Sequence, residues 1–344
     1  MKGRRIVQPQ LSEDDLALLN ALQIAPRAGW AELARVLGST PATLAARWER
    51  LHSTGTAWIT VSPKAIGQRV QSAMLEIELE GARKDEAIAA LCRDPRAVTI
   101  EETASGRDLV VTTFAREQAA LAAFVLDDLP RISGVRRVAM HLITAVHREG
   151  GDWRLDALDR GQQSALLATA RPGEPRNHIP EGYLPVVDAL ARDGRASAAQ
   201  IARRTGRNPA TVRRQVTRLI ESDVLAFRCE VAQLRSRWAI VYTWFARVPM
   251  SAMERTVRAL ATLPELRLCI SISGKANLVF AVWARSPGDL MRLEHRMNEK
   301  LPWLTLLESV QTLRMPKRMG WLLDGYGRSR GEFVEPAAVH AAVG

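Results

Sequence analysis

Short helical patterns around a glycine turn open the first half of the chain. Behind the helix cap Ser12, residues 11–23 place three leucines on one face: Leu16, Leu19 and Leu22. A second helix is predicted at about 30–37 and ends at Gly38, and a third begins at Pro41. This spacing is typical of a helix-turn-helix, whose later helix can lie in a DNA major groove.

The third predicted helix divides into an apolar face and a polar face. Its apolar positions, which should point inward, are Leu44, Trp48 and Leu51. Its polar stripe on the opposite side is Thr43, Arg47 and Arg50. A β-prone stretch at 56–61 follows, and we interpret it as a wing.

The same organisation returns in the second half of the chain. Residues 33–51 align without a gap with residues 201–219, at an offset of 168, and Ser105-Gly106 aligns with Ser273-Gly274. The inner stripe of this copy is Val212, Val216 and Leu219, and its outer stripe is Thr211, Arg214, Gln215 and Arg218. A second wing is predicted at 224–231. The duplication therefore spans whole halves of the chain.

An alternation of strands and helices follows each helical unit. Residues 72–80 alternate apolar with acidic positions, which predicts a strand with one face in water. A helix at about 83–93, two strands joined by a glycine turn, a helix at 117–129 and a strand from about 135 to 146 complete the order βαββαβ. This order is the ferredoxin-like plan. The second half repeats it, so the predicted fold class is α+β, with two winged helix-turn-helix domains alternating with two ferredoxin-like domains.

Breaker residues and changes of period set the predicted domain boundaries. The winged helix-turn-helix domains are expected at 11–63 and 181–232, and the ferredoxin-like domains at 70–148 and 237–323. Residues 149–180 form a linker, in which an amphipathic helix with Leu155, Leu158 and Leu166 is expected to dock between domains. Residues 324–344 show no sustained period and are expected to form a flexible tail.

The first strand of the second ferredoxin-like domain is apolar on both faces. One face carries Ile240, Tyr242, Trp244 and Ala246, and the other carries Val241, Thr243 and Phe245. A strand of this kind needs cover on both sides. We therefore expect its outer face to pack against another such domain, within the chain or in a second copy.

Composition narrows the class of protein. The chain has 344 residues, of which 47% are hydrophobic and 25% charged, so it can bury several cores. No apolar stretch approaches the ~18 residues of a membrane-spanning helix, and no signal-peptide pattern is present, which predicts a soluble, intracellular protein. Three separated cysteines, Cys92, Cys229 and Cys269, fit neither a disulfide framework nor a metal site and are expected to be buried thiols.

The charge of the chain favours a polyanionic partner, and nucleic acid before membrane. The 48 basic and 37 acidic residues give a net charge of +11. Residues 195–218 contain seven Arg and no acidic residue, whereas the matching residues 27–50 contain four Arg and two Glu. The second helix-turn-helix is therefore the stronger candidate for binding DNA.

The candidate DNA-binding residues lie on and just before the two third helices. They are Thr43, Arg47 and Arg50 in the first copy and Arg207, Asn208, Thr211, Arg213, Arg214, Gln215 and Arg218 in the second. Arg can donate to guanine and Gln can pair with adenine, while flanking Arg can meet phosphates. The alternative is that these positions are the solvated faces of a helical domain that has no DNA partner.

At this point the chain resembles the Lrp/AsnC family of bacterial transcription regulators, in a tandem form. The resemblance is carried by Gly38-Ser39-Thr40-Pro41, by Gly206-Arg207-Asn208-Pro209 and by the βαββαβ domains with their glycine turns. The family turn is approximately G-x-x-D-L. Here Gly274-Lys275-Ala276-Asn277-Leu278 matches it with Asn for Asp, and Gly106-Arg107-Asp108-Leu109 is one residue shorter.

The resemblance implies a regulator that binds double-stranded DNA, in the cytoplasm at the nucleoid, with ligand-sensing RAM domains paired as a pseudo-dimer within the chain and a homo-oligomer beyond it. It also implies a small effector, often an amino acid, near the glycine turns. Only Gly106, Asp108, Gly274 and Asn277 are carried over as effector-binding residues. A tight β-turn alone would also favour these residue types.

Two other functions stay open. Siroheme decarboxylases are similar in fold and would gather His and Arg at a macrocycle pocket, but the six histidines here are scattered: His52, His141, His147, His178, His295 and His340. A protein-interaction scaffold with vestigial helix-turn-helix units is the third possibility. We expect no cofactor, no metal site and no catalytic residues, because no recognised catalytic spacing is present.

Overall fold

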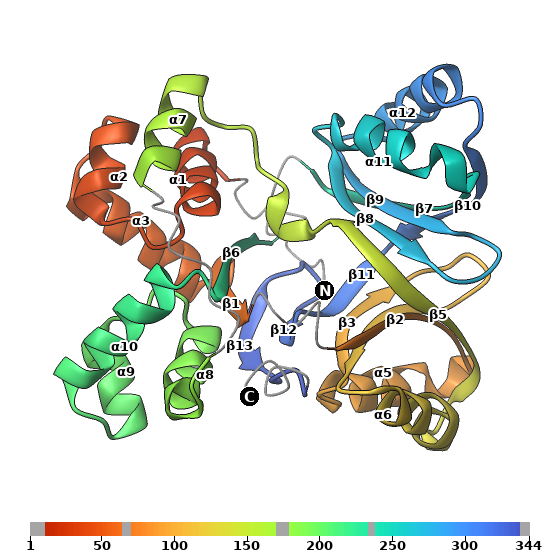
Figure 1. Ribbon diagram of the computed structural model, residues 1–344, viewed down its shortest axis with the longest axis horizontal. Helices are drawn as coiled ribbons and strands as arrows, with labels where there is room; N and C mark the ends of the chain where they lie inside the picture. Colours follow the sequence, from red (N-terminus) through yellow and green to blue (C-terminus); the bar gives the residue numbers. More distant parts are fainter. Residues whose placement is uncertain (1–10, 64–69, 170–178, 233–237, 338–344) are drawn as a thin grey trace, which may run out of the picture.

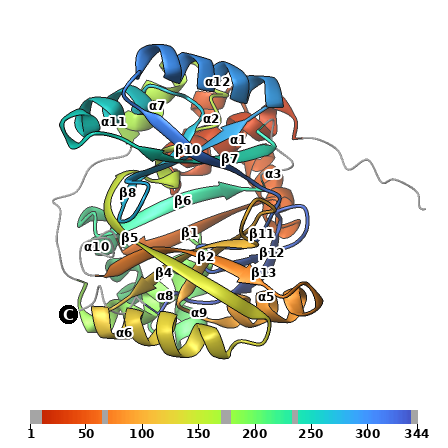
Figure 2. The ribbon, with the colours of Figure 1, turned by 90° about the vertical axis from the view of Figure 1, so that its right-hand side faces the viewer.

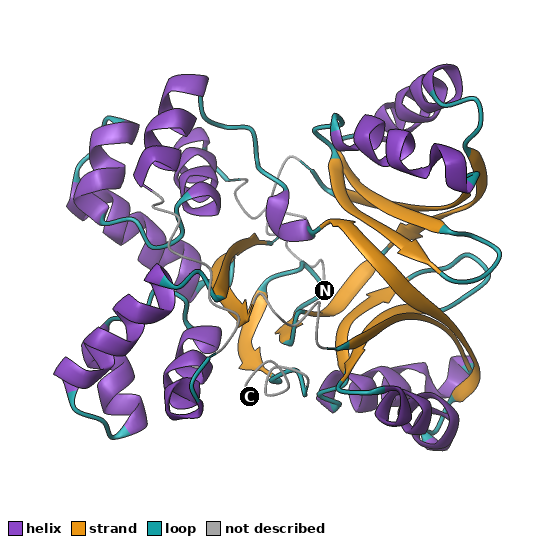
Figure 3. Ribbon diagram, in the orientation of Figure 1, coloured by secondary structure: helices purple, strands orange, loops and turns teal. Residues whose placement is uncertain are grey.

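The computed structural model describes residues 11–63, 70–169, 179–232 and 238–337. Helical units occupy one side of the molecule and sheet-containing units the other (Figures 1 and 3). We call residues 11–63 the first head and residues 179–232 the second head. We call the sheet-containing units the first αβ domain (residues 70–148) and the second αβ domain (residues 238–312).

Each head is built of three helices whose ends are defined by caps. The first head contains α1 (Glu13–Ile24), α2 (Trp30–Leu37) and α3 (Pro41–Ser53), and the second contains α8 (Leu184–Arg192), α9 (Ala198–Thr205) and α10 (Pro209–Glu221). Gly38 and Gly206 end α2 and α9 at φ angles of +62° and +66°, the left-handed conformation that favours glycine. Thr40 and Asn208 then cap α3 and α10 through their side chains. Both helix-turn-helix units form as the sequence predicts.

The strands expected as two separate wings pair with each other instead. β1 (Ala57–Pro63) of the first head and β6 (Leu225–Val231) of the second form an antiparallel two-stranded sheet, with Ala57 opposite Val231. Each strand is thus the partner that the other needs for its backbone hydrogen bonds. The wing prediction is wrong in this respect, and the pairing ties the two heads into one unit.

Both αβ domains have the ferredoxin-like strand order. In the first, β2 (Gln71–Leu79), β3 (Ala97–Glu102), β4 (Leu109–Ala115) and β5 (Val135–Arg148) lie in the order β5-β2-β4-β3. In the second, β7 (Ile240–Arg247), β8 (Leu266–Ile272), β9 (Leu278–Ala284) and β10 (Thr305–Thr312) lie in the order β10-β7-β9-β8. The covering helices are α5 (Lys84–Arg93) and α6 (Gln118–Ala122, extended by a wider turn to Asp128) in the first domain, and α11 (Met253–Ala261) and α12 (Pro287–Lys300) in the second.

The last strand of each αβ domain continues into the other domain. The first half of β5 pairs with β2, and its second half pairs with β8. After β10, the chain forms β11 (Arg314–Arg318), which pairs with β3. Figure 2 shows the resulting sandwich, with α11 and α12 above the sheets and α5 and α6 below them. The exchange joins the two domains with pseudo-twofold symmetry.

The doubly apolar strand β7 is covered on both faces within the chain. On its inner side, Trp244 and Ala246 lie in the core beneath α11 and α12. On its outer side, Phe245 packs with Met74 and Val110 of the first αβ domain. The prediction that this face packs against another such domain is confirmed, and the partner is the other half of the same chain.

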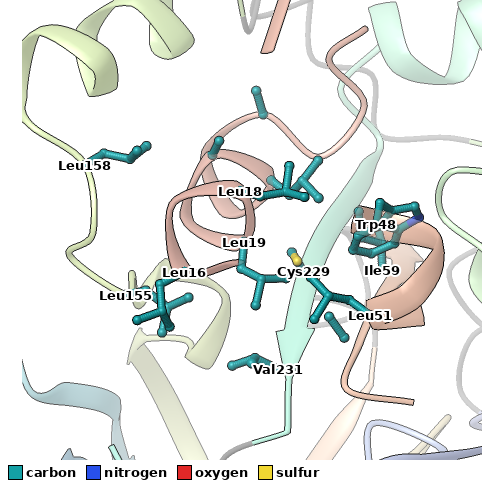
Figure 4. Close-up of a cluster of buried hydrophobic side chains, with 14 of the residues drawn as sticks. Leu16, Leu18, Leu19, Trp48, Leu51, Ile59, Leu155, Leu158, Cys229 and Val231 are labelled. Carbon is teal, nitrogen blue, oxygen red and sulfur yellow. The ribbon is translucent and has the colours of Figure 1, made fainter. Parts of the chain in front are cut away.

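The linker docks a helix on the first head. α7 (Arg160–Thr169) packs against α1 and α2, and the three predicted leucines Leu155, Leu158 and Leu166 are buried. Only Leu166 lies on the helix, because α7 begins after Leu155 and Leu158. Figure 4 shows Leu155 beside Leu16 of α1; Leu158, Cys229 and Val231 belong to the same cluster of buried side chains. The first head therefore has a covering helix outside its own three.

The chain after residue 323 is more ordered than its composition predicts. β12 (Trp321–Leu323) pairs with β11, and β13 (Ser329–Phe333) pairs with β12. The N–H of Ser329 also donates to the carbonyl of Gly55 in the first head, 2.9 Å away. The expected flexible tail at 324–344 is wrong for residues 324–337, because strand pairing needs no hydrophobic period. Within the described residues, no helix has the length and apolar character to cross a membrane.

Candidate nucleic-acid interface

The second head presents a cationic surface on α10. Arg213, Arg214 and Arg218 are exposed, and we call these three residues the α10 surface. Within the described residues, Arg213 and Arg214 have no hydrogen-bond or ion-pair partner, and Arg218 donates to the hydroxyl of Tyr183 at 3.2 Å. Free guanidinium groups on the second helix of a helix-turn-helix are suited to phosphate oxygens and guanine edges.

The start of α10 holds the other candidates in this head. The side chain of Asn208 accepts from the N–H of Ala210 at 2.8 Å, so it caps the helix. Thr211 is half-buried in the first turn. Arg203 and Arg204 on α9 are also exposed, although the sequence analysis did not single them out. Their position in the seven-arginine stretch was the signal that could have found them.

Gln215 does not belong to the exposed stripe. It is 9% exposed, and its amide donates to the carbonyl of Gly182 at 3.4 Å. Arg207 donates to the same carbonyl at 2.6 Å and to the side chain of Gln215 at 3.4 Å. The prediction that Gln215 faces DNA is contradicted, because its side chain turns toward the short helical turn before α8.

In the first head, acidic residues of α1 pair with the candidate arginines of α3. Arg47 forms an ion pair with Asp14 at 3.0 Å, and Arg50 forms one with Asp15 at 2.5 Å. The side chain of Arg47 is 20% exposed, whereas that of Arg50 is 56% exposed. Thr43 shares a hydrogen bond with the cap Thr40. The candidates of this head are brought together, but their cations are already paired.

The offset of 168 residues aligns these contacts one by one. Gly182 and Tyr183 stand where the first head has Asp14 and Asp15, and Gln215 stands in place of Arg47. The first head holds four Arg and five acidic residues, and the second holds nine Arg and six acidic residues. Arg218 thus meets a tyrosine where Arg50 meets an aspartate, and Arg213 and Arg214 stand in place of Ala45 and Ala46.

Two arginines of the charge stretches lie between the heads instead of on the surface. Arg195 donates to the carbonyls of Pro26 and Ala28, at 2.7 and 3.0 Å, and Arg27 donates in the same way to the carbonyl of Gly194. Burial and the neighbouring charge of Arg27 lower the pKa of Arg195 to about 10. The charge available for a polyanion is therefore smaller than the sequence count indicates.

The glycine turns lie at the contact between the two αβ domains. Gly106 and Gly274 adopt positive φ angles of +72° and +120°, and a side chain at Gly274 would collide with the ring of His141. Asp108 accepts from the N–H of Leu79 at 2.8 Å. Asn277 accepts from the N–H of Val248 at 2.9 Å and donates to its carbonyl at 2.7 Å. Both polar side chains thus secure the end of the first strand of their domain.

Ion pairs join the two domains beside these turns. Arg107 pairs with Glu76 of its own domain at 2.9 Å and with Glu308 of the second domain at 2.5 Å. His141 contacts Glu76 at 2.9 Å and the carbonyl of Ser273 at 3.1 Å. The hydrogen bond to Glu76 raises the pKa of His141, and the carbonyl of Ser273 adds to this effect.

Comparisons with known proteins agree with this geometry. A family model described as the AsnC-type helix-turn-helix domain matches residues 11–52, and one described as winged helix-turn-helix DNA-binding matches residues 186–225. The chain thus contains two helix-turn-helix units of DNA-binding type in tandem, and the first of them is of AsnC type.

Two curated relatives are described as uncharacterized HTH-type transcriptional regulators. The one from Pyrococcus abyssi is 25% identical over 144 residues, which cover 41% of this chain and 90% of that protein. The one from Pyrococcus horikoshii is 26% identical over 144 residues, which cover 42% of this chain and 87% of that protein. Each relative thus corresponds in length to about one half of this chain.

A solved structure shares the whole tandem architecture. The siroheme decarboxylase NirDL in co-complex with an iron-uroporphyrin III analogue has a TM-score of 0.59, 14% sequence identity, and coverage of 96% of this chain and 98% of that one. At this identity the likeness shows the fold alone. The fold of this chain over nearly its whole length is therefore one that a solved structure also has.

Proposed function

We propose that the protein is a sequence-specific transcription regulator that binds double-stranded DNA mainly through its second head. The observation that carries this proposal is the state of the α10 surface. Its arginines are exposed and two of them have no partner in the described chain, whereas Arg47 and Arg50 in the first head are paired with aspartates. Because the heads differ, the operator is imperfect and asymmetric.

The experiment is a mobility shift with genomic DNA fragments at two salt concentrations. The wild-type chain should retain a specific subset of fragments, and Arg214→Ala with Arg218→Ala should weaken this binding. Each lost phosphate contact should lower the slope of log affinity against log salt by about 0.9. A matched control is Arg258→Ala, because Arg258 is an exposed arginine of α11 whose ion pair within the described residues is with Glu254. Equal binding by all three proteins would refute the proposal.

A small effector, such as an amino acid, is the second part of the proposal. Its site would lie at Gly106, Asp108, Gly274 and Asn277. The position of the turns at the contact between the αβ domains supports this, since a ligand there could change how the domains pair. The side chains of Asp108 and Asn277 already form hydrogen bonds with backbone groups, so a ligand would be bound mainly by main-chain groups. A calorimetric titration with an amino-acid panel, repeated with Gly274→Ala, tests the site.

Tetrapyrrole chemistry is the alternative that the shared fold raises. The described histidines do not meet at one place: His52 stacks on Trp48, His141 contacts Glu76, and His147 contacts Ser271. His295 pairs with Glu299 on α12, and His178 and His340 lie outside the described residues. An absorbance scan after incubation with a porphyrin separates this function from DNA binding, and failure of both assays favours an interaction scaffold.

A further inference from the structure

A large cavity lies between the heads and the sheets. Its volume is about 1420 Å³, and its walls come from the first head, the second head, both αβ domains and the C-terminal strands. The glycine turns lie elsewhere, since Gly106, Asp108, Gly274 and Asn277 are not among its lining residues. The cavity is therefore distinct from the effector site proposed above.

The cavity has mostly apolar walls. Phe114 and Ile143 line it from the first αβ domain, Trp283 from the second, and Phe227 from the second head. Typical pockets for drug-sized ligands measure ~300–1,000 Å³, so a free amino acid would leave most of this space unfilled. Apolar walls of this extent suit a ligand with a bulky apolar body.

Three arginines gather at one buried carboxylate beside the cavity. Arg228 pairs with Glu230, and Arg267 and Arg318 each contact the same carboxylate at 3.2 Å. Glu230 is 2% exposed and does not line the cavity, whereas all three arginines do. The cations thus stand between the carboxylate and the open space.

Positive charge exceeds negative charge within the arginine cluster, although five other acidic residues line the rest of the cavity: Glu32, Glu149, Asp152, Glu221 and Asp223. Burial opposes the charge of Glu230, yet the three arginines lower its pKa to about 2, so this group is anionic. Glu101 also lines the cavity, but burial raises its pKa against the hydrogen bond from Thr312 and the charge of Arg318. Even with Glu101 ionised, the three arginines face two carboxylates. Buried charge of one sign is unfavourable unless a counter-ion is present.

We propose that this cavity binds one bulky organic anion, with its acidic group at Arg228, Arg267 and Arg318 and its apolar body against Phe114, Ile143 and Trp283. Carboxylates and sulfonates on an aromatic or long aliphatic body belong to this class. Arg267 is held for this role by the ring of Trp283, which lies 4.2 Å from its guanidinium carbon. The ligand contacts heads and sheets at once, so it is placed to set their relative position.

The test uses the full chain and the fluorescent anion 1-anilinonaphthalene-8-sulfonate. The wild-type protein should bind one equivalent in a saturable way, and the neutral N-phenyl-1-naphthylamine should bind about tenfold more weakly. Arg267→Gln should lower the affinity for the sulfonate by about tenfold and leave that for the neutral amine unchanged. Arg258→Gln, the same change at an exposed arginine outside the cavity, should bind as the wild type does.

A second variant keeps the test decisive if Arg267→Gln folds poorly. Thr112→Trp places an indole in the cavity from β4, two residues from Phe114, and leaves every charge in place, so it should weaken binding of both probes. Thermal melting of each variant verifies that it is folded. Sulfonate binding that neither substitution weakens, or that equals binding of the neutral amine, overturns the proposal.

The outcome is separable from that of the DNA-binding proposal. A mobility shift with the same proteins measures the α10 surface, which shares no residue with the arginine cluster. If the sulfonate does not bind as expected but DNA still binds, only the inference about the cavity is refuted. Probe binding without any DNA shift leaves the cavity assignment in place and removes the proposed function.

Discussion

The two heads share a backbone plan but differ in what stands opposite their third helix. In the first head, Asp14 and Asp15 on α1 pair with Arg47 and Arg50. In the second, the equivalent positions are Gly182 and Tyr183, and the cations of α10 stay exposed. The first head also carries α7, which packs on α1 and α2. The surface charge of a duplicated domain can thus change through substitutions on the third helix and on the segment opposite it, with its helix-turn-helix intact.

The largest expected effect is the loss of DNA affinity when arginines are removed from the second head and not from the first. Arg214→Ala with Arg218→Ala should lower DNA affinity by roughly a hundredfold, because each charged contact contributes about 1–3 kcal/mol. Arg47→Ala with Arg50→Ala removes arginines that are already paired and should change it less than threefold. Fluorescence anisotropy with one retained fragment measures both. A larger loss from the first-head pair would reverse our ranking.

Transplanting an aspartate should make the second head resemble the first. Tyr183→Asp places a carboxylate beside Arg218, as Asp15 stands beside Arg50, and should lower DNA affinity about tenfold. The control Tyr183→Phe removes only the hydroxyl and should bind as the wild type does. If Tyr183→Asp binds with unchanged affinity in the same anisotropy assay, the pairing of Arg50 does not explain the difference between the heads.

Replacing the turn glycine of either head should lower stability by a similar amount, but the two replacements should differ in their effect on DNA binding. Gly38→Ala and Gly206→Ala each place a side chain at a positive φ angle, with no neighbouring atom within 4 Å of the new carbon. Each should destabilise its head by about 1–2 kcal/mol, which urea unfolding measures. Only Gly206→Ala should lower DNA affinity. Equal losses of binding would show that both heads are used alike.

The smallest expected effect concerns the αβ domains, where His141 has no histidine counterpart in the second half. Its pKa is raised by Glu76, so its stabilising contribution is complete below the ordinary histidine pKa of about 6.5 and is lost as the pH rises through the raised value. Melting temperatures between pH 6 and 9 should therefore fall slightly. His141→Gln should remove this slope, and His295→Gln on exposed α12 should leave it. A slope unaffected by His141→Gln would exclude this contact as its source.

Local signals in the sequence were sufficient to predict the helices and strands and much of the topology. Caps and glycines at Gly38 and Gly206 define the helix-turn-helix units, and period-two alternation defines the strands. The apolar outer face of β7 correctly predicted a covering domain, because a strand that is apolar on both faces must be buried on both. These features depend on neighbours in sequence or on a single burial rule.

Features that depend on contacts between distant parts of the chain could not be predicted from the sequence. β1 and β6 pair across 160 or more residues, and no local pattern distinguishes such a pair from two wings. Gln215 lies on the polar stripe of α10, yet the carbonyl of Gly182 draws it inward. Arg27 and Arg195 count as surface charge in the sequence but bind carbonyls of the opposite head. Side-chain reach and the position of a remote backbone decide each case.

The most direct measurement is site-specific photocrosslinking to a retained DNA fragment. A photoreactive amino acid replaces Ala210 or, in a separate protein, its counterpart Ala42; both are exposed in the first turn of the third helix of their head. We predict efficient crosslinks to DNA from position 210 and few from position 42. Crosslinks from position 42 alone, or none from position 210 while the DNA is bound, would contradict the assignment of DNA binding to the second head.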